Sequence, residues 1–146
     1  MEQMNFSILS WLVWVPVAGA VAILFVPRDK SDVIKWMAAG FTGLQVILAA
    51  ILWMNFDKDH VGFQFMEKAD WIPSFNIHYM MGLDGISFPL VVLTAFVCML
   101  AMGASWPIHN HVKAYCILFL LLETGMLGVF MALDFFLFYV FWEVML

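Results

Sequence analysis

Long apolar stretches separated by short polar links make up most of the chain. A helix needs about 20 apolar residues to cross the roughly 30 Å hydrocarbon core of a bilayer. Four windows reach that length, at residues 6–26, 36–56, 85–105 and 114–133. A fifth window, residues 135–146, ends after about 18 Å of helix, roughly half of the way across. The pattern predicts an all-α integral membrane domain over residues 1–146, with four full transmembrane helices and a truncated fifth.

Composition narrows the class of protein. The chain is 65% hydrophobic and 12% charged, whereas soluble domains average roughly 45–50% apolar and about 25% charged residues. The net charge is −5 and the six lysines and arginines are dispersed, so no basic stripe is present to bind nucleic acid. Cys98 and Cys116 lie inside apolar runs, without the spacing of a disulfide framework or a metal site. We therefore expect a protein that lies in the lipid bilayer and binds neither nucleic acid nor metal.

The charges in the links predict how the chain lies in the membrane. Three of the six cations, including Lys35, fall in the link at residues 27–35, and Lys113 falls in the link at residues 106–113. The long link at residues 57–84 carries two lysines against five acidic residues. Because cytoplasmic loops are enriched in Lys and Arg, we expect the two short links to face the cytoplasm. The long link and the N-terminus then lie outside.

The long outer link also carries a structural pattern. Polarity alternates along residues 62–65 and 75–79, with the turn residues Pro73 and Ser74 between them, so we expect a small surface hairpin. Asp84 precedes the third helix. Its carboxylate can accept hydrogen bonds from the first free N–H groups of that helix, which predicts an N-cap.

Two acidic residues, Glu123 and Glu143, lie inside apolar windows. An ionised side chain at the centre of a spanning helix costs roughly 2.5–3.5 kcal/mol on insertion scales, so such groups usually face a protein interior or a water path. Desolvation opposes the charge and a nearby lysine favours it, so a partner that approaches and leaves can load and unload a proton. We therefore predict both glutamates as catalytic residues of proton translocation. If the last two helices form a hairpin, both lie at the same depth, because each is ten positions from Leu133.

A structural role is the alternative for both glutamates. A protonated carboxyl can join two helices through a hydrogen bond worth about 0.6 to 2 kcal/mol in membranes. Thr124 and Gly125, next to Glu123, suit helix packing. The sequence carries no glycine-rich phosphate loop, dinucleotide-binding fingerprint or cysteine-rich cluster site. We therefore expect no cofactor-binding residue in this chain.

Two segments resemble a known family. The stretches MGLDGISFPLVVLT (residues 81–94) and LLLETGMLGVFMALDFFLFYVFWEVML (residues 120–146) are similar to subunit M of the bacterial proton-pumping NADH:quinone oxidoreductase, respiratory complex I. The likeness runs across essentially the whole chain and is closest from Tyr79 onward. Looser versions of the motifs occur in the wider antiporter-like family. The resemblance implies the N-terminal part of a longer subunit, built from inverted repeats around broken helices.

The resemblance also implies roles for three residues. Glu143 matches the glutamate that pairs with a membrane lysine on a later helix of that family and takes part in proton translocation. Glu123 matches a glutamate found in many subunits of this type, and Asp84 matches a position that we interpret as structural. The implied function is proton translocation coupled to electron transfer from NADH to quinone, performed as a subunit of the enzyme.

Cofactors, partners and location follow from the same resemblance. NADH, FMN, the iron–sulfur clusters and quinone are expected in other subunits of the complex. The partners are the other membrane subunits of complex I, and the chain is expected as a multi-pass protein of the cell inner membrane.

One departure from the family pattern leaves other functions open. The later helices and their lysines are absent, and no lysine lies inside a predicted span, so Glu143 has no visible partner. A subunit of a multisubunit sodium/proton antiporter or of a membrane-bound hydrogenase would carry similar helices. A non-catalytic helical membrane protein, in which the two glutamates only join helices, is a third alternative.

Overall fold

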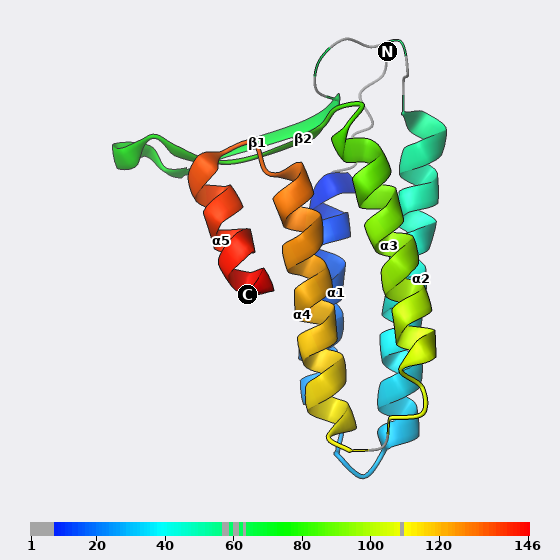
Figure 1. The fold of residues 1–146 in the computed structure, drawn as a ribbon. Coiled ribbons are helices and arrows are strands. Elements are labelled where there is room, and N and C mark those ends of the chain that lie inside the picture. Colours follow the sequence, from blue (N-terminus) through cyan, green and yellow to red (C-terminus); the bar gives the residue numbers. More distant parts are fainter. Residues whose placement is uncertain (1–7, 57–58, 60–61, 63, 109) are drawn as a thin grey trace.

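Five helices and one β-hairpin form the described part of the chain. The computed structural model describes residues 8–56, 59, 62, 64–108 and 110–146. The helices are α1 (Ile8–Leu24), α2 (Ser31–Asn55), α3 (Ser87–Ala104), α4 (Val112–Met131) and α5 (Phe135–Met145). The hairpin consists of β1 (Gln64–Ile72), a 3₁₀ turn (Pro73–Phe75) and β2 (Ile77–Leu83). Figure 1 shows the hairpin lying across one end of the helices.

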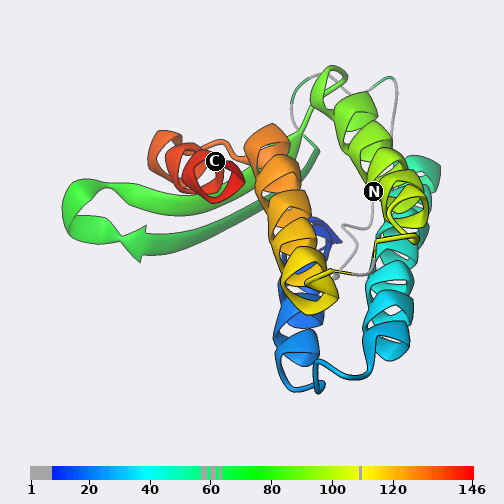
Figure 2. The same cartoon turned by 60° about the horizontal axis from the view of Figure 1, so that its bottom comes forward.

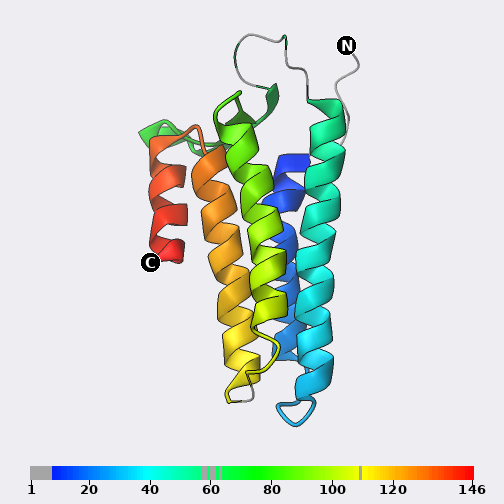
Figure 3. The ribbon, with the colours of Figure 1, turned by 45° about the vertical axis from the view of Figure 1, so that its right-hand side comes forward.

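Helices α1 to α4 form an elongated bundle, which Figures 2 and 3 show from two further directions. Helix α1 packs along α4 and α2 packs along α3, while α4 also contacts α2 and α3. Such helices suit a bilayer because each satisfies its own backbone N–H and C=O groups where no water can. The mostly helical membrane fold predicted from hydropathy is therefore confirmed.

Three of the described helices, rather than the expected four, are long and apolar enough to cross a membrane by length and composition. These are α2, α3 and α4. Helix α1 has 17 described residues and α5 has 11. The window predicted for the first span began at Phe6, which lies outside the described residues.

The start of α2 corrects one prediction. The helix begins at Ser31 instead of Trp36, so Lys35 lies within a candidate span and not in the preceding link. Its side chain is only 6% exposed, and Nζ donates a 2.7 Å hydrogen bond to the carbonyl oxygen of Trp106. A hydropathy window ends at a charge, whereas a lysine near a helix end can bury its methylene stem and place its ammonium at a polar partner.

Two apolar clusters hold the bundle together. The upper cluster, next to the hairpin, draws on all five helices and on Met81 and Leu83 of β2. The lower cluster, at the opposite end, is built from α1, α2, α3 and α4. Between these two clusters the buried faces of α2 and α4 are polar.

The predicted hairpin is confirmed, and it is longer than the sequence pattern indicated. The strands pair antiparallel, with Gln64 opposite Leu83 and Asp70 opposite His78. The pattern at residues 62–65 includes Phe63, which lies outside the described residues. Asp84 Oδ1 accepts from the N–H groups of Ile86 at 2.9 Å and Ser87 at 2.7 Å, so it bonds free N–H groups at the start of α3 as predicted, although the N-cap position itself is Ile86. These two bonds, Ser87 first, hold the pKa of Asp84 below its ordinary value despite some opposing desolvation.

The hairpin also positions the turn between α4 and α5. The N–H of Leu133 donates to the carbonyl oxygen of Met80 at 2.9 Å, and Met81 forms an isolated antiparallel bridge with Ala132. The backbone of Ala132 is extended. The turn therefore runs alongside β2 as a short third strand would, and this sets where α5 begins.

Candidate functional site

A buried polar layer lies between the two apolar clusters. On α2, Ala38 belongs to the lower cluster and Leu48 to the upper one, with Thr42 and Gln45 between them. On α4, Leu120 belongs to the lower cluster and Leu127 to the upper one, with Glu123 and Thr124 between them. We call Thr42, Gln45, Glu123 and Thr124 the polar layer; none is more than 3% exposed.

The structure brings the polar layer together from two helices that run in the same direction. The end of the bundle opposite the hairpin carries the links after α1 and after α3 (Figure 3), and we call it the loop end. Helices α2 and α4 both run from the loop end to the hairpin end (Figure 1) and are in contact. On both helices the polar residues lie between the lower and the upper cluster.

Glu123 is fully enclosed. Its side chain is 0% exposed, and among the described residues neither carboxyl oxygen has a hydrogen-bond partner. The prediction that this carboxyl faces a protein interior agrees with its position. The alternative, in which Glu123 joins two helices, finds no hydrogen bond in the described part of the chain.

The neighbouring residue makes that helix-to-helix bond instead. Thr124 Oγ1 lies 3.1 Å from the carbonyl oxygen of Val13 on α1 and 3.2 Å from that of Leu120 on its own helix. Pro16, one turn beyond Val13, lacks an N–H and disturbs the hydrogen-bond ladder of α1 at this level. Thr124 thus fixes the rotation of α4 about its axis, which in turn directs Glu123 into the bundle.

Gln45 was not found by inspection of the sequence. Its side chain is 0% exposed, and both Oε1 and Nε2 are without a hydrogen-bond partner among the described residues. A signal for it existed, since a buried amide within an apolar span is costly unless it is paired. An amide carries no charge, however, so only its burial distinguishes it from a polar residue that faces outward.

Glu143 lies in a different environment. Leu137 and Phe141 are the buried residues of α5 and belong to the upper cluster, so they mark the side of α5 that meets α4. Glu143 follows Phe141 by two residues, which is about 200° around the helix, and it is exposed. The hydroxyl of Tyr139, one turn earlier on α5, lies near the carboxylate of Glu143.

Close glycine contacts set the depth of the two glutamates. A Cβ added at Gly125 would lie 3.0 Å from the backbone nitrogen of Met145, so these residues are at the same level. Glu143 then lies about 6 Å nearer the hairpin than Glu123, from four residues of helical rise. The predicted equal depth is therefore wrong by about one turn, because Ala132 steps along β2 and displaces the start of α5. The two carboxyls also point in different directions, Glu123 into the bundle and Glu143 away from α4.

The geometry of the site defines a class of protein. A carboxyl and an amide are enclosed within helices that are long and apolar enough to cross a bilayer. The class is a multi-helix integral membrane protein that carries a titratable group inside its bundle.

Comparison with known proteins places the chain within this class. It belongs to the family described as NADH-ubiquinone oxidoreductase chain 4, amino terminus, whose model matches residues 15–133. NADH-quinone oxidoreductase subunit M of Rhodobacter capsulatus is 38% identical over 141 residues, which are 94% of this chain and 27% of that protein. The chloroplastic NAD(P)H-quinone oxidoreductase chain 4 of Mesostigma viride is 33% identical over 140 residues, 95% of this chain and 28% of that protein.

A solved structure shows the same fold. A chain of respiratory complex I from Thermus thermophilus with bound NADH superposes with a TM-score of 0.75, at 24% sequence identity, over 94% of this chain and 27% of that chain. The resemblance stated from the sequence motifs is thus confirmed. The chain spans about a quarter of the length of the curated relatives that it matches.

Proposed function

We propose that this chain acts in the membrane part of an NADH:quinone oxidoreductase and takes part in proton translocation coupled to electron transfer from NADH to quinone. The observation that carries the proposal is Glu123, which is fully enclosed in a bundle of spanning helices without a protein partner among the described residues. Burying an ionisable group in a membrane costs free energy, so such a group usually marks a functional site. The family membership supplies the reaction to which it would be coupled.

Glu123 and Glu143 are proposed as the proton-carrying residues. Because they point in different directions, they do not exchange a proton directly in this arrangement. Glu143 faces away from α4, which suits a partner contributed by another part of the subunit or complex. NADH, FMN, iron–sulfur clusters and quinone are proposed to be held by other subunits, and this chain is proposed to bind other membrane subunits and lipid.

The proposed topology is a multi-pass protein of the inner membrane in which α1 also crosses, with the loop end of the bundle in the cytoplasm. The structure supports the grouping on which this rests, because the links after α1 and after α3 lie together at the end opposite the hairpin (Figure 3). Lys113 Nζ there donates to the carbonyl oxygen of Leu24 at 2.9 Å. A cation at a helix C-terminus is favourable. The N-terminus would then lie outside.

Substitutions of the two glutamates in the assembled complex test this function. Glu143→Gln and Glu123→Gln preserve the shape of the side chain but remove its acidic proton. We expect each complex to assemble and to oxidise NADH, while proton pumping per NADH falls to background in sealed vesicles. Asp29→Asn, an exposed loop residue, is the matched control and should pump normally. Normal pumping by assembled complexes of both glutamine variants would refute the proposal.

The two other transport functions, a sodium/proton antiporter subunit and a membrane-bound hydrogenase subunit, are less well supported. The relatives reported above are both named as quinone oxidoreductase chains. The non-catalytic alternative requires Glu123 to join helices, and Thr124 makes that bond instead.

A further inference from the structure

Gln45 is a buried polar residue for which the proposed function provides no role. An amide side chain offers two donor hydrogens and an oxygen that accepts two bonds. The side chain is fully buried, and neither of its polar atoms has a partner among the described residues. Native proteins rarely leave such groups unsatisfied, and each exception calls for an explanation such as an ordered water.

Glu123 also carries polar atoms that lack a hydrogen-bond partner among the described residues, and it lies between the same two apolar clusters as Gln45. Both oxygens of its carboxyl are buried and unpartnered within the described residues. The two side chains occupy the polar layer on α2 and α4, two helices in contact, with apolar residues of the lower and upper clusters on either side along each helix. Among the described residues, four buried side-chain oxygen and nitrogen atoms lack a hydrogen-bond partner, and all four belong to Gln45 and Glu123.

The other two members of the polar layer have spare capacity to accept hydrogen bonds. Thr42 Oγ1 donates within its own helix, towards the carbonyl oxygens of Ala38 at 3.1 Å and Ala39 at 2.9 Å. Thr124 Oγ1 donates towards the carbonyl oxygen of Val13 on α1 and that of Leu120 on its own helix. A hydroxyl that donates its hydrogen keeps its lone pairs, so both threonines can accept from a water molecule in this layer.

We propose that Gln45 and Glu123 bind ordered water between α2 and α4, and that Gln45 is a positioning residue for the Glu123 carboxyl. A buried water needs two to four polar partners, and this layer supplies an amide, a carboxyl and two hydroxyl groups. The apolar clusters above and below confine the water to one level. Gln45 gains and loses no proton; it orients the water, and the water bonds the carboxyl.

The binding of water in the polar layer does not depend on the proposed function. A role of that water in proton transport does rest on the proposed function. Water bonded to Glu123 would provide the partner through which a proton reaches or leaves the carboxyl. Gln45 would then affect pumping without touching the transferred proton.

The first test is a density map of the unaltered complex containing this chain, at a resolution that reveals ordered water. We expect density for at least one water within hydrogen-bonding distance of both Gln45 and Glu123. A dry layer, or a direct bond between the amide and the carboxyl, would overturn the proposal. No variant is needed, so folding defects cannot obscure this result.

The second test measures the positioning role by infrared spectroscopy of the assembled complex. The carbonyl stretch of protonated Glu123 is assigned as the band that disappears in Glu123→Gln. In Gln45→Met, which keeps the length of the side chain but removes its polar atoms, the band should move to higher frequency because the carboxyl loses a hydrogen bond. Thr94→Val is the matched control, because Thr94 lies outside the polar layer and its hydroxyl is bonded to Leu90 within its own helix, α3; it should leave the band unchanged. An unmoved band in an assembled Gln45→Met complex would contradict the positioning role.

Measurements of proton pumping distinguish the hydration site from the proposed function in transport. We expect Gln45→Met to lower the pumping rate by about tenfold, the effect of one lost hydrogen bond, and Gln45→Asn, which keeps the amide, to retain more of it. If Glu123→Gln pumps normally while the water and the band shift are observed, the transport role fails and the hydration site stands. If the layer is dry, the hydration site fails whatever the pumping result.

Discussion

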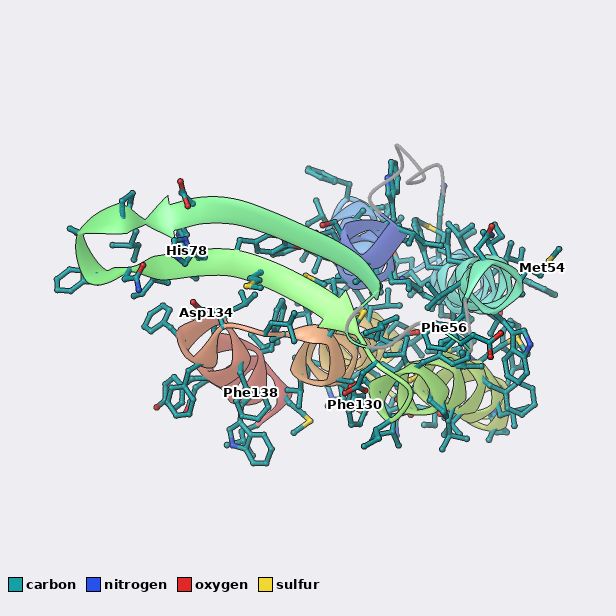
Figure 4. All side chains as sticks on the ribbon, turned by 90° about the horizontal axis from the view of Figure 1, so that it is seen from above. Met54, Phe56, His78, Phe130, Asp134 and Phe138 are labelled. Atoms are coloured by element: carbon teal, nitrogen blue, oxygen red, sulfur yellow. The ribbon has the colours of Figure 1, made fainter. Side chains whose placement is uncertain are left out.

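The backbone N–H of His78 donates a 3.1 Å hydrogen bond to Oδ2 of Asp134, although the two residues are 56 positions apart in the chain. Figure 4 shows His78 on the hairpin above Asp134 at the start of α5. The other oxygen of Asp134 accepts from the N–H groups of Phe136 at 2.9 Å and Leu137 at 3.3 Å. One carboxylate thus caps α5 and fastens it to β2, and this link determines where Glu143 lies.

Asp134→Ala should therefore loosen α5. Loss of an N-cap typically costs about 0.5–2 kcal/mol, and this residue also provides the hydrogen bond to β2. We expect faster amide hydrogen exchange at His78, Phe136 and Leu137, measured by mass spectrometry on the complex in detergent. Asp134→Asn separates the two roles, because its single side-chain oxygen can cap α5 but its amide nitrogen cannot accept from the N–H of His78; exchange should rise at His78 and stay slow at Phe136 and Leu137. Equal exchange in the alanine variant and the unaltered protein would show that the link contributes nothing.

The same link predicts a dependence on pH. The N–H of His78 is the largest cause, followed after an opposing desolvation by those of Leu137 and Phe136, and together they hold the pKa of Asp134 below its ordinary value. A group with a lowered folded-state pKa contributes stability above its unfolded-state pKa, near 3.9 for Asp, and loses it as the pH falls through the folded-state value. Protection of the α5 amides, corrected for intrinsic exchange, should fall over this acidic range.

Asp134→Asn is also the control for the pH experiment. The asparagine variant removes the Asp134 carboxyl and keeps the neighbouring contact between Asp70 Oδ1 and Nδ1 of His78, which are 2.9 Å apart. A pH profile that stays the same in this variant would show that Asp134 is not its source.

Close packing between α4 and α5 gives a third prediction. A Cβ added at Gly128 would lie 2.3 Å from the ring of Phe141, which is closer than two non-bonded carbon atoms can approach. Gly128→Ala should therefore push α5 away and destabilise the subunit by about 1–3 kcal/mol, measured by titration of the complex with denaturing detergent.

Two further substitutions make the glycine experiment specific. A Cβ at Gly40 meets nothing within 4 Å, so Gly40→Ala should be neutral or stabilising. Adding Phe141→Leu to Gly128→Ala should recover part of the loss, because the smaller side chain makes room for the new methyl group. No recovery in the double variant would show that the clash with Phe141 is not the cause.

The fourth prediction separates Glu123 from its neighbour. Thr124→Val removes the hydrogen bond to Val13 and should cost about 0.6 to 1.7 kcal/mol of stability in the membrane. Glu123→Gln keeps a hydrogen-bonding side chain of the same shape and breaks no direct bond to another described residue, so it should cost less than Thr124→Val in the same detergent titration. A larger loss for Glu123→Gln would contradict the assignment of the helix-joining role to Thr124.

Local patterns predicted the elements of this protein well. The apolar windows, the hairpin with its turn at Pro73 and Ser74, and the cap at Asp84 all follow from residues that are close together in the chain. Hydropathy, turn preference and capping are short-range properties. The two intramembrane glutamates could be found for the same reason, since a carboxyl in an apolar run stands out without knowledge of the fold.

Helix rotation and register were decided only by the tertiary structure. The bond from Thr124 to Val13 turns Glu123 into the bundle, and the contacts of Gly125 and Gly128 with α5 turn Glu143 away from α4. The burial of Gln45 without a partner among the described residues, and the reach of Lys35 from within α2 to Trp106, are likewise properties of the folded chain. Each of these facts depends on contacts between residues far apart in the sequence. A helix can bury several faces of an apolar sequence almost equally well in lipid, so packing against its neighbours, and not its own pattern, selects the face.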